Sequence, residues 1–334
     1  MQNKVSTIYS PSVIAKVLHS IACVSERLCI VLCLTLATST HASDAPESIV
    51  FVLSGHAPVY ERVANATEQR IKSKCSSKFI DCKNLTFVNV TVEKAPNDIA
   101  NDALLTVTLG IKASKWSEKS QGANKTINAM LPYDPPKNAP IGVSNSTSRI
   151  YIDQPYKRYF DLIKTTTPRL GRVGLLVHEN NLDQVGIITE IANSRGLTLK
   201  TSIVSAERSV GEALSYLLDD IDVLLALPDS RIHNSQTISH ILTTAYRNNI
   251  PVFGFSSAYA KAGAIAALYT SPEDIAHQIS DTVLDLLNHD RFDSHSQQAS
   301  YFSVSFNFEV ARSLGLPPIS PSEIKKTISQ GSEK

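Results

Sequence analysis

Short apolar runs alternate with amphipathic helical patterns between Arg172 and Tyr269. Val, Leu and Ile dominate the runs RVGLLV and IDVLLALPDS, whereas GIITEIANSRG and GEALSYLLDD repeat their apolar residues at helical spacing. Most of the runs end in Asp, Asn, Ser or Gly. This alternation predicts βαβ units that close a parallel sheet. Ligands of such sheets bind at the carboxyl ends of the strands, where the loops lie.

A second, smaller set of βα units is predicted nearer the start of the chain. Apolar or alternating runs predict strands at Ser48–Leu53, Leu85–Val92, Leu105–Leu109 and Ile127–Leu131. Helical spacing predicts helices at Val59–Lys74, Ile99–Leu104 and Lys112–Lys119. The chain is therefore expected to form two α/β lobes.

The segment from Lys137 to Pro155 is polar and rich in turn residues, which predicts a crossover between the lobes. Tyr156–Thr165 then begins the second lobe as a helix. Past this lobe, Pro272–Leu287 is a strongly amphipathic helix, and YFSVSFNF is a last strand.

Composition and charge narrow the classes of function. Apolar residues make up 43% of the 334 residues, and 32 Lys and Arg against 31 Asp and Glu leave a formal charge of +1. No basic run or basic amphipathic helix stands out, so we expect no nucleic-acid partner.

The first residues read as a secretory leader. Lys4, Lys16 and Arg27 precede the apolar run Leu28–Ala37, and small residues lie at Thr40–Ala42. This order predicts a signal peptide over residues 1–42, with an uncleaved anchor as the alternative. No cysteine follows in the context of a lipoprotein signal, so we expect a free periplasmic protein.

Past the leader, the chain keeps only Cys75 and Cys82. Two cysteines this close in an oxidising compartment predict one disulfide that closes a small loop. No His flanks the pair, which argues against a metal site.

The sequence gives little support for an enzymatic function. The motifs G-x-S-x-G, G-x-x-x-x-G-K-[ST], H-E-x-x-H and G-x-G-x-x-G are all absent. The histidines share no metal-ligand spacing. We therefore expect no catalytic residues, no metal and no cofactor.

Polar and aromatic residues at strand ends are the candidates for binding a small polar molecule. Hydroxyls and backbone N–H groups suit a carboxylate, Asp suits an ammonium, and aromatic rings suit an apolar body. Ser and Asp at these places also cap helices, and this second interpretation stays open. The candidates are Ser54, Gly55 and His56; Tyr133 and Asp134; Glu179 and Asn180 in the loop His178–Asn181; Asp229 and Ser230; and Phe255, Ser256, Ser257 and Tyr259.

Several stretches carry a family likeness. VGLLVHENN, DVLLALPDS, IPVFGFSSAYAKAGAIAAL and the terminal FNFEVARSLGLP resemble ABC-transporter periplasmic substrate-binding proteins, in the group that includes tryptophan- and tyrosine-binding members. LPYDP in the first lobe resembles a family motif in which Thr usually precedes Asp-Pro. The second-lobe motif departs from the family's usual Thr-Asp-Asn, because this chain has Asp229 and Ser230.

The resemblance implies a type I periplasmic-binding-protein fold, in which two Rossmann-like lobes close on a solute. We expect residues 47–145 plus about 270–297 to form the first lobe and 146–269 plus about 300–320 the second, with a flexible tail at 321–334. The implied function is capture of an amino acid or related molecule by a monomer and its delivery to an ABC permease in the inner membrane. A sensor that signals to a membrane receptor or kinase is the alternative, and an enzyme is a third reading.

Overall fold

A computed structural model describes residues 47–77, 82, 84–96, 98–120, 125–133, 146–289, 291–292 and 294–332. The predicted leader, the candidate Asp134 and the start of the predicted crossover lie outside these described residues. Within the described ranges, no helix is long and apolar enough to cross a membrane.

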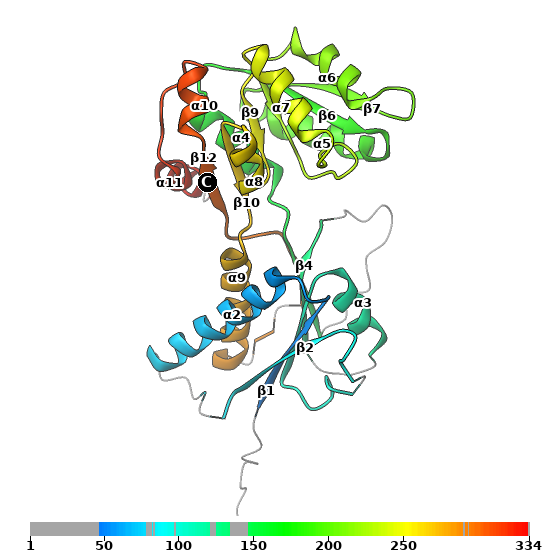
Figure 1. The fold of residues 1–334 in the computed structure, drawn as a ribbon. Coiled ribbons are helices and arrows are strands. Elements are labelled where there is room, and N and C mark those ends of the chain that lie inside the picture. Colours follow the sequence, from blue (N-terminus) through cyan, green and yellow to red (C-terminus); the bar gives the residue numbers. More distant parts are fainter. Residues whose placement is uncertain are drawn as a thin grey trace, which may run out of the picture. The chain divides into compact units, whose positions relative to one another are not determined.

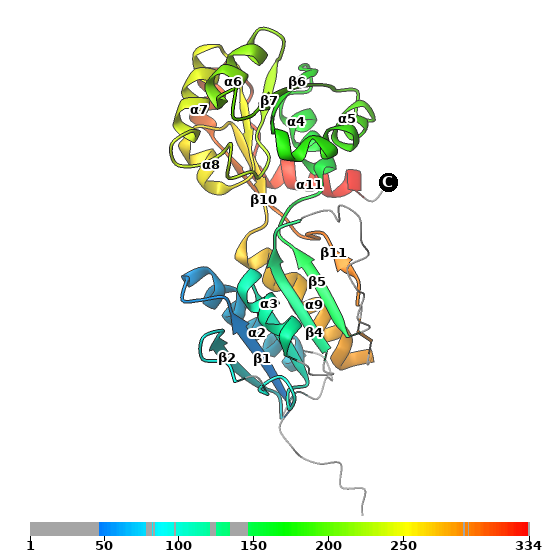
Figure 2. The same cartoon turned by 90° about the vertical axis from the view of Figure 1, so that its right-hand side faces the viewer.

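The first lobe is a parallel six-stranded sheet in the order β11-β5-β4-β3-β1-β2. Figure 2 shows several of these strands side by side. The strands are β1 (Ser48–Leu53), β2 (Thr86–Thr91), β3 (Leu105–Leu109), β4 (Lys125–Leu131), β5 (Thr147–Tyr151) and β11 (Ser296–Gln297). The helices that cover the sheet are α2 (Pro58–Ser77), α3 (Ile111–Lys119) and α9 (Pro272–His289).

Alternate side chains of β1 point into two different cores. Ile49 and Phe51 pack with Val63 of α2 and Ile279 of α9, and Figure 1 shows these two helices side by side. Val50 and Val52 face the opposite way and pack with Ala113 of α3. Because both faces are covered, the strand is a continuous apolar run, as parallel strands in α/β proteins are.

The second lobe is a six-stranded sheet in the order β12-β10-β9-β8-β6-β7, parallel except for β12. Its strands are β6 (Arg172–His178), β7 (Thr198–Val204), β8 (Val223–Leu225), β9 (Val252–Gly254), β10 (Ala266–Tyr269) and β12 (Ser303–Phe306). Its α-helices are α4 (Tyr156–Thr166), α5 (Val185–Asn193), α6 (Val210–Leu218), α7 (Ile238–Arg247), α8 (Ser257–Ala262), α10 (Phe308–Ser313) and α11 (Pro321–Ser332), and η1 (Glu179–Gln184) is a 3₁₀ helix. Two buried clusters, one on each face, hold this sheet between its helices. The predicted α/β class, with two Rossmann-like lobes, is confirmed.

Two predicted limits are wrong. The first lobe does not end at residue 145, because β5 pairs with β4 in the first sheet and extends that lobe to Tyr151. Residues 321–332 are not a flexible tail, because α11 packs on α4 with Ile324 and Ile328 almost completely buried.

The helix predicted over Ile99–Leu104 is also absent. Residues 98–101 form turns, and the backbone N–H of Asn101 donates to the carbonyl of Asp98 at 2.8 Å. Ala100 and Ala103 are nevertheless buried, so burial of small residues produced the apolar spacing without a helix.

Three segments connect the two sheets, after β5, after β10 and before β12. The side-chain amide of Gln154 joins all three, because it donates to the hydroxyl of Thr270 at 2.6 Å and to the carbonyl of Tyr301 at 2.9 Å. Its oxygen accepts from Arg158 at 2.6 Å. Gln154 is only 3% exposed, so these bonds are made away from solvent.

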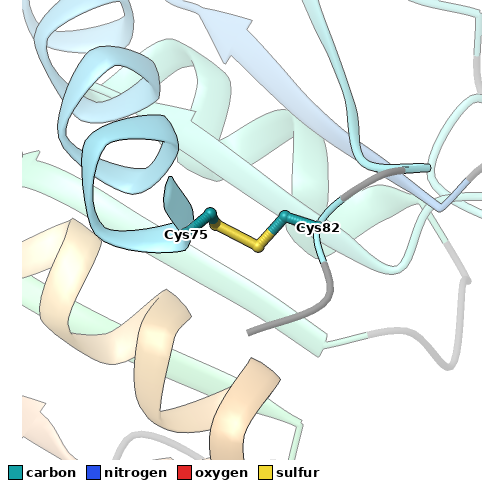
Figure 3. Close-up of a disulfide and its surroundings, with 2 residues drawn as sticks. All are labelled: Cys75 and Cys82. Carbon is teal, nitrogen blue, oxygen red and sulfur yellow. A yellow bond between two sulfur atoms is a disulfide. The ribbon is translucent and has the colours of Figure 1, made fainter. Parts of the chain in front are cut away.

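Cys75 in α2 and Cys82, just before β2, are joined by a disulfide in the first lobe (Figure 3). The pairing agrees with the one predicted from their spacing. A bridge that closes so short a loop contributes about 2 kcal/mol to the free energy of unfolding.

Candidate functional site

A pocket of about 650 Å³ lies at the carboxyl ends of β6 and β8. His178 ends β6 and Leu227 follows β8, and η1 and the turn after β8 supply amide and charged groups. The side chains at the ends of β4 and β5 and the start of α4 line it as well. The lining comprises Pro132, Tyr133, Asp153, Gln154, Tyr156, Tyr159, Leu175, Leu176, Val177, His178, Asn180, Asn181, Gln184, Ile188, Leu227, Pro228, Asp229, Arg231 and Gln298.

Asp229 in this pocket is paired with Arg231. The guanidinium donates to one carboxylate oxygen from Nε at 2.9 Å and to the other from Nη2 at 3.0 Å. The backbone N–H of Arg231 and the side-chain amide of Asn181 also donate to Asp229. Burial alone would raise the pKa of Asp229, but the hydrogen bonds and charge of Arg231 outweigh burial and lower it. Asp229 is therefore a fixed anion with its own cation.

Asp153 follows β5 and accepts a hydrogen bond from the backbone N–H of Tyr133. Among the ion pairs recorded for the described residues, none includes Asp153. Burial raises the pKa of its carboxyl group, and the hydrogen bond from Tyr133 only partly opposes this effect.

Tyrosine rings form one wall of the pocket. Tyr133 packs edge-on against Tyr151, with ring centroids 5.3 Å apart. The hydroxyl of Tyr156 donates to the side chain of Gln184 at 2.6 Å. Burial and then the nearby charge of Asp153 raise the pKa of Tyr156 to about 12, so this hydroxyl stays protonated. The wall thus offers apolar surface and the neutral hydroxyl of Tyr156.

The structure brings three of the predicted binding residues together in the pocket: Tyr133, Asn180 and Asp229. The prediction named neither Asp153 nor Tyr156. Both follow β5, and an Asp directly after a strand was the signal that could have found them. That signal was lost because TSRIY contains too few apolar residues to be recognised as a strand.

Tyr259 is a correction. Its side chain is 1% exposed, packs in the core of the second lobe, and shares a 3.1 Å hydrogen bond with Nδ1 of His233. Phe255 and Ser256 line a separate hollow of about 430 Å³ beside α7 and α8. The Ser256 side chain caps α8 by accepting from the backbone N–H of Tyr259, and Ser257 is the first residue of that helix. Capping of α8 by Ser256 and core packing of Tyr259 therefore account for the polar and aromatic residues of this loop.

The remaining candidates also lie outside the pocket lining. The hydroxyl of Ser54 accepts from the backbone N–H of Ala113 at 2.9 Å and so anchors the start of α3. Gly55 follows it, and His56 is exposed. Glu179 and Ser230 are exposed too, and the carbonyl of Ser230 accepts from the side chain of Asn234 at 3.2 Å.

A family model described as ABC transporter substrate binding protein matches residues 140–317, which is more than half of the chain. The chain belongs to this substrate-binding protein family. Members bind small-molecule ligands, work with ABC permeases and are typically found outside the cytoplasm. Most of the pocket lining, including Asp153 and Asp229, falls within the matched range.

Solved structures of substrate-binding proteins share the fold of this family member. A ligand-free, open substrate-binding protein with adhesive properties from Clostridium difficile has a TM-score of 0.65 and 16% identity, covering 84% of this chain and 98% of that chain. A domain from Streptococcus pneumonia in complex with L-Trp has a TM-score of 0.52 and 16% identity, with the same two coverages.

A conserved domain protein from Vibrio cholerae has a TM-score of 0.51 and 18% identity, covering 82% of this chain and 96% of that chain. At these identities the likeness extends to the fold alone. No curated protein matches the sequence of this substrate-binding protein.

Proposed function

We propose that this protein captures a small polar molecule, an amino acid or a related compound, in the pocket at the ends of β6 and β8. It delivers the molecule to an ABC permease in the inner membrane. The predicted leader directs the protein to the periplasm, where it acts as a free monomer. The pocket is the main support for this proposal. It is a cavity of ligand size at the strand ends where α/β sheets bind their ligands, in a chain that belongs to a substrate-binding protein family.

Binding acts through the segments that connect the sheets. Asp153, Gln154 and Tyr156 line the pocket and belong to the connection after β5, and Gln154 is bonded to the other two connections. A ligand that contacts this connection and the strand ends of the second lobe stabilises one arrangement of the hinge over others. The permease can distinguish the ligand-bound protein from the free protein by this shift in the hinge arrangement.

A thermal-shift screen of the mature protein tests the proposal. The panel contains amino acids, amines, purines and sugars, and the L-Trp complex of the Streptococcus pneumonia domain is the reason to include aromatic amino acids. A bound solute at about 100 times its Kd stabilises the folded state by about 2.7 kcal/mol and raises Tm by several degrees.

Two matched variants locate the binding site. Leu227→Trp fills the pocket and abolishes the Tm increase, whereas Ala258→Trp places the same ring in the hollow beside α8 and leaves the increase intact. A panel in which no solute raises Tm contradicts the proposed function. An increase that Ala258→Trp removes and Leu227→Trp keeps contradicts the choice of pocket.

A further inference from the structure

The formal charges of the side chains that line the pocket do not sum to zero. Its Asp and Arg residues are Asp153, Asp229 and Arg231, and the lining holds no Lys or Glu, so their formal sum is −1. The Asp229 and Arg231 charges cancel within one bidentate pair. The excess negative charge therefore belongs to Asp153.

Among the described residues, no cation is recorded as a partner of Asp153. One carboxylate oxygen accepts from the backbone N–H of Tyr133, which is a neutral donor. Tyr156 and Tyr159, which also line the pocket, are neutral phenols at physiological pH, because burial raises the pKa of each. A partly buried carboxylate with only neutral neighbours interacts more strongly with an incoming cation than an exposed carboxylate does, because water screens it less.

Amide side chains such as Asn181 and Gln184 line one part of the pocket, and another part of its wall is apolar. Leu175, Ile188 and Leu227 lie there with the ring of Tyr156, and the volume of about 650 Å³ is in the range of pockets that bury a small organic molecule. One uncompensated carboxylate beside an apolar wall matches a molecule with a cationic end and an apolar body. An anionic molecule without an ammonium group would meet the like charge of Asp153.

We propose that Asp153 is the specificity-determining residue of the pocket and binds a primary ammonium group of the ligand, whose apolar body lies against Tyr156 and the aliphatic wall. The inference rests on the proposed function, since it specifies the ligand class of the same pocket. It also gives the ligand a direct contact with the connection after β5.

Calorimetry with two pairs of probes tests this assignment. Phenethylamine is compared with 2-phenylethanol, and L-phenylalanine with 3-phenylpropanoate, because the members of each pair differ in the ammonium group. Wild-type protein is expected to bind the ammonium member of at least one pair, and more tightly than its partner. Asp153→Asn is expected to weaken that binding about 10- to 100-fold and to remove the preference within the pair.

The two control measurements separate charge from structure. Asn at position 153 keeps an oxygen for the Tyr133 N–H, so Tm in the absence of ligand is expected to stay the same or rise as a desolvated charge is removed. Asp183→Asn removes an exposed carboxylate that lies close enough to affect Tyr156 but does not line the pocket, and it is expected to leave affinity unchanged.

Three results overturn the assignment. They are equal binding within both pairs, unchanged affinity in Asp153→Asn, and no binding of any of the four probes. If another solute in the thermal-shift panel then raises Tm and Leu227→Trp removes the increase, only the assignment of Asp153 fails and the proposed function stands. Both proposals fail if no solute in that panel raises Tm.

Discussion

Gly254 and Tyr259 show how closely the second lobe is packed at the end of β9. A Cβ at position 254 would lie 2.8 Å from atoms of the Tyr259 side chain, and that ring is 1% exposed. The glycine is required because the backbone and the ring touch, and the sequence block that contains them stabilises the lobe.

Gly254→Ala is therefore expected to lower the free energy of unfolding by about 1–3 kcal/mol, because the buried ring has to move. Gly171→Ala is the matched control, since a Cβ at that position meets nothing within 4 Å. Urea unfolding of both variants measures the difference. Equal stability of the two variants would contradict the close approach.

His233 makes stability depend on pH. Burial lowers its pKa to about 4, and only the charge of Asp229 opposes this. The unfolded chain takes up a proton near the ordinary pKa of about 6.5, whereas the folded protein stays neutral there until about pH 4. The stabilisation is thus fully present above about pH 6.5 and is lost as pH falls.

Between about pH 6.5 and about pH 4, this group alone is expected to lower the free energy of unfolding by about 3 kcal/mol. His233→Asn removes the titration and is expected to flatten the profile by that amount. Denaturant unfolding at a series of pH values measures both curves. The same slope in variant and wild type would show that His233 is not the titrating group.

At the residue scale, the sequence predicted the chemistry of the strand ends better than the contacts of each residue. It placed Asp229 at the end of β8, but it could not show that Arg231, two residues later, turns back to neutralise it. It took Tyr259 as a ligand contact because an aromatic residue after a strand can face either solvent or the core. Only the packing of α8 decides between these two orientations.

At the scale of elements, apolar runs with both faces buried were predicted best. The bounds of β1 and β3 agree with the predicted ranges, because nearly every residue of these strands is buried. β5 was missed because it holds Thr147, Ser148 and Arg149, and its polar residues were read as part of a crossover. Pairing with β4 stabilises this strand, and a neighbour in space leaves no local pattern in the sequence.

Helix α11 was missed for a related reason. Its buried face consists of Ile324 and Ile328 alone, one turn apart, with polar and charged residues elsewhere along the helix. Two apolar residues give a weak periodic signal, and a polar chain end was taken for a tail. The contact with α4 makes the helix part of the second lobe.

Ile324→Ala is expected to destabilise the protein by about 2–5 kcal/mol, because it leaves a cavity in the core of the second lobe. Lys326→Ala on the same helix is exposed and is expected to change stability by less than about 0.5 kcal/mol. Thermal unfolding of the two variants is the measurement. Equal Tm values for the two variants would contradict the packing of α11 and favour a flexible tail at residues 321–332.

At the scale of the whole molecule, the pocket and the three connecting segments are linked by a shared residue. Gln154 lies between Asp153 and the start of α4, lines the pocket, and bonds the other two connections. The sequence predicted the fold and the family because repeated βα units and the second-lobe motifs are local patterns. It did not predict Asp153, because this carboxylate acquires its surroundings only when β4, β5 and α4 come together.

A crystal structure of the protein with the solute that raises Tm most in the screen would show directly where that solute binds. The solute is expected in the pocket at the ends of β6 and β8, with an ammonium nitrogen about 2.7–3.0 Å from the Asp153 carboxylate. A solute bound elsewhere, with this pocket empty, would contradict the proposed binding site. A solute in the pocket with no cationic group near Asp153 would leave the proposed function standing and remove the assignment of Asp153.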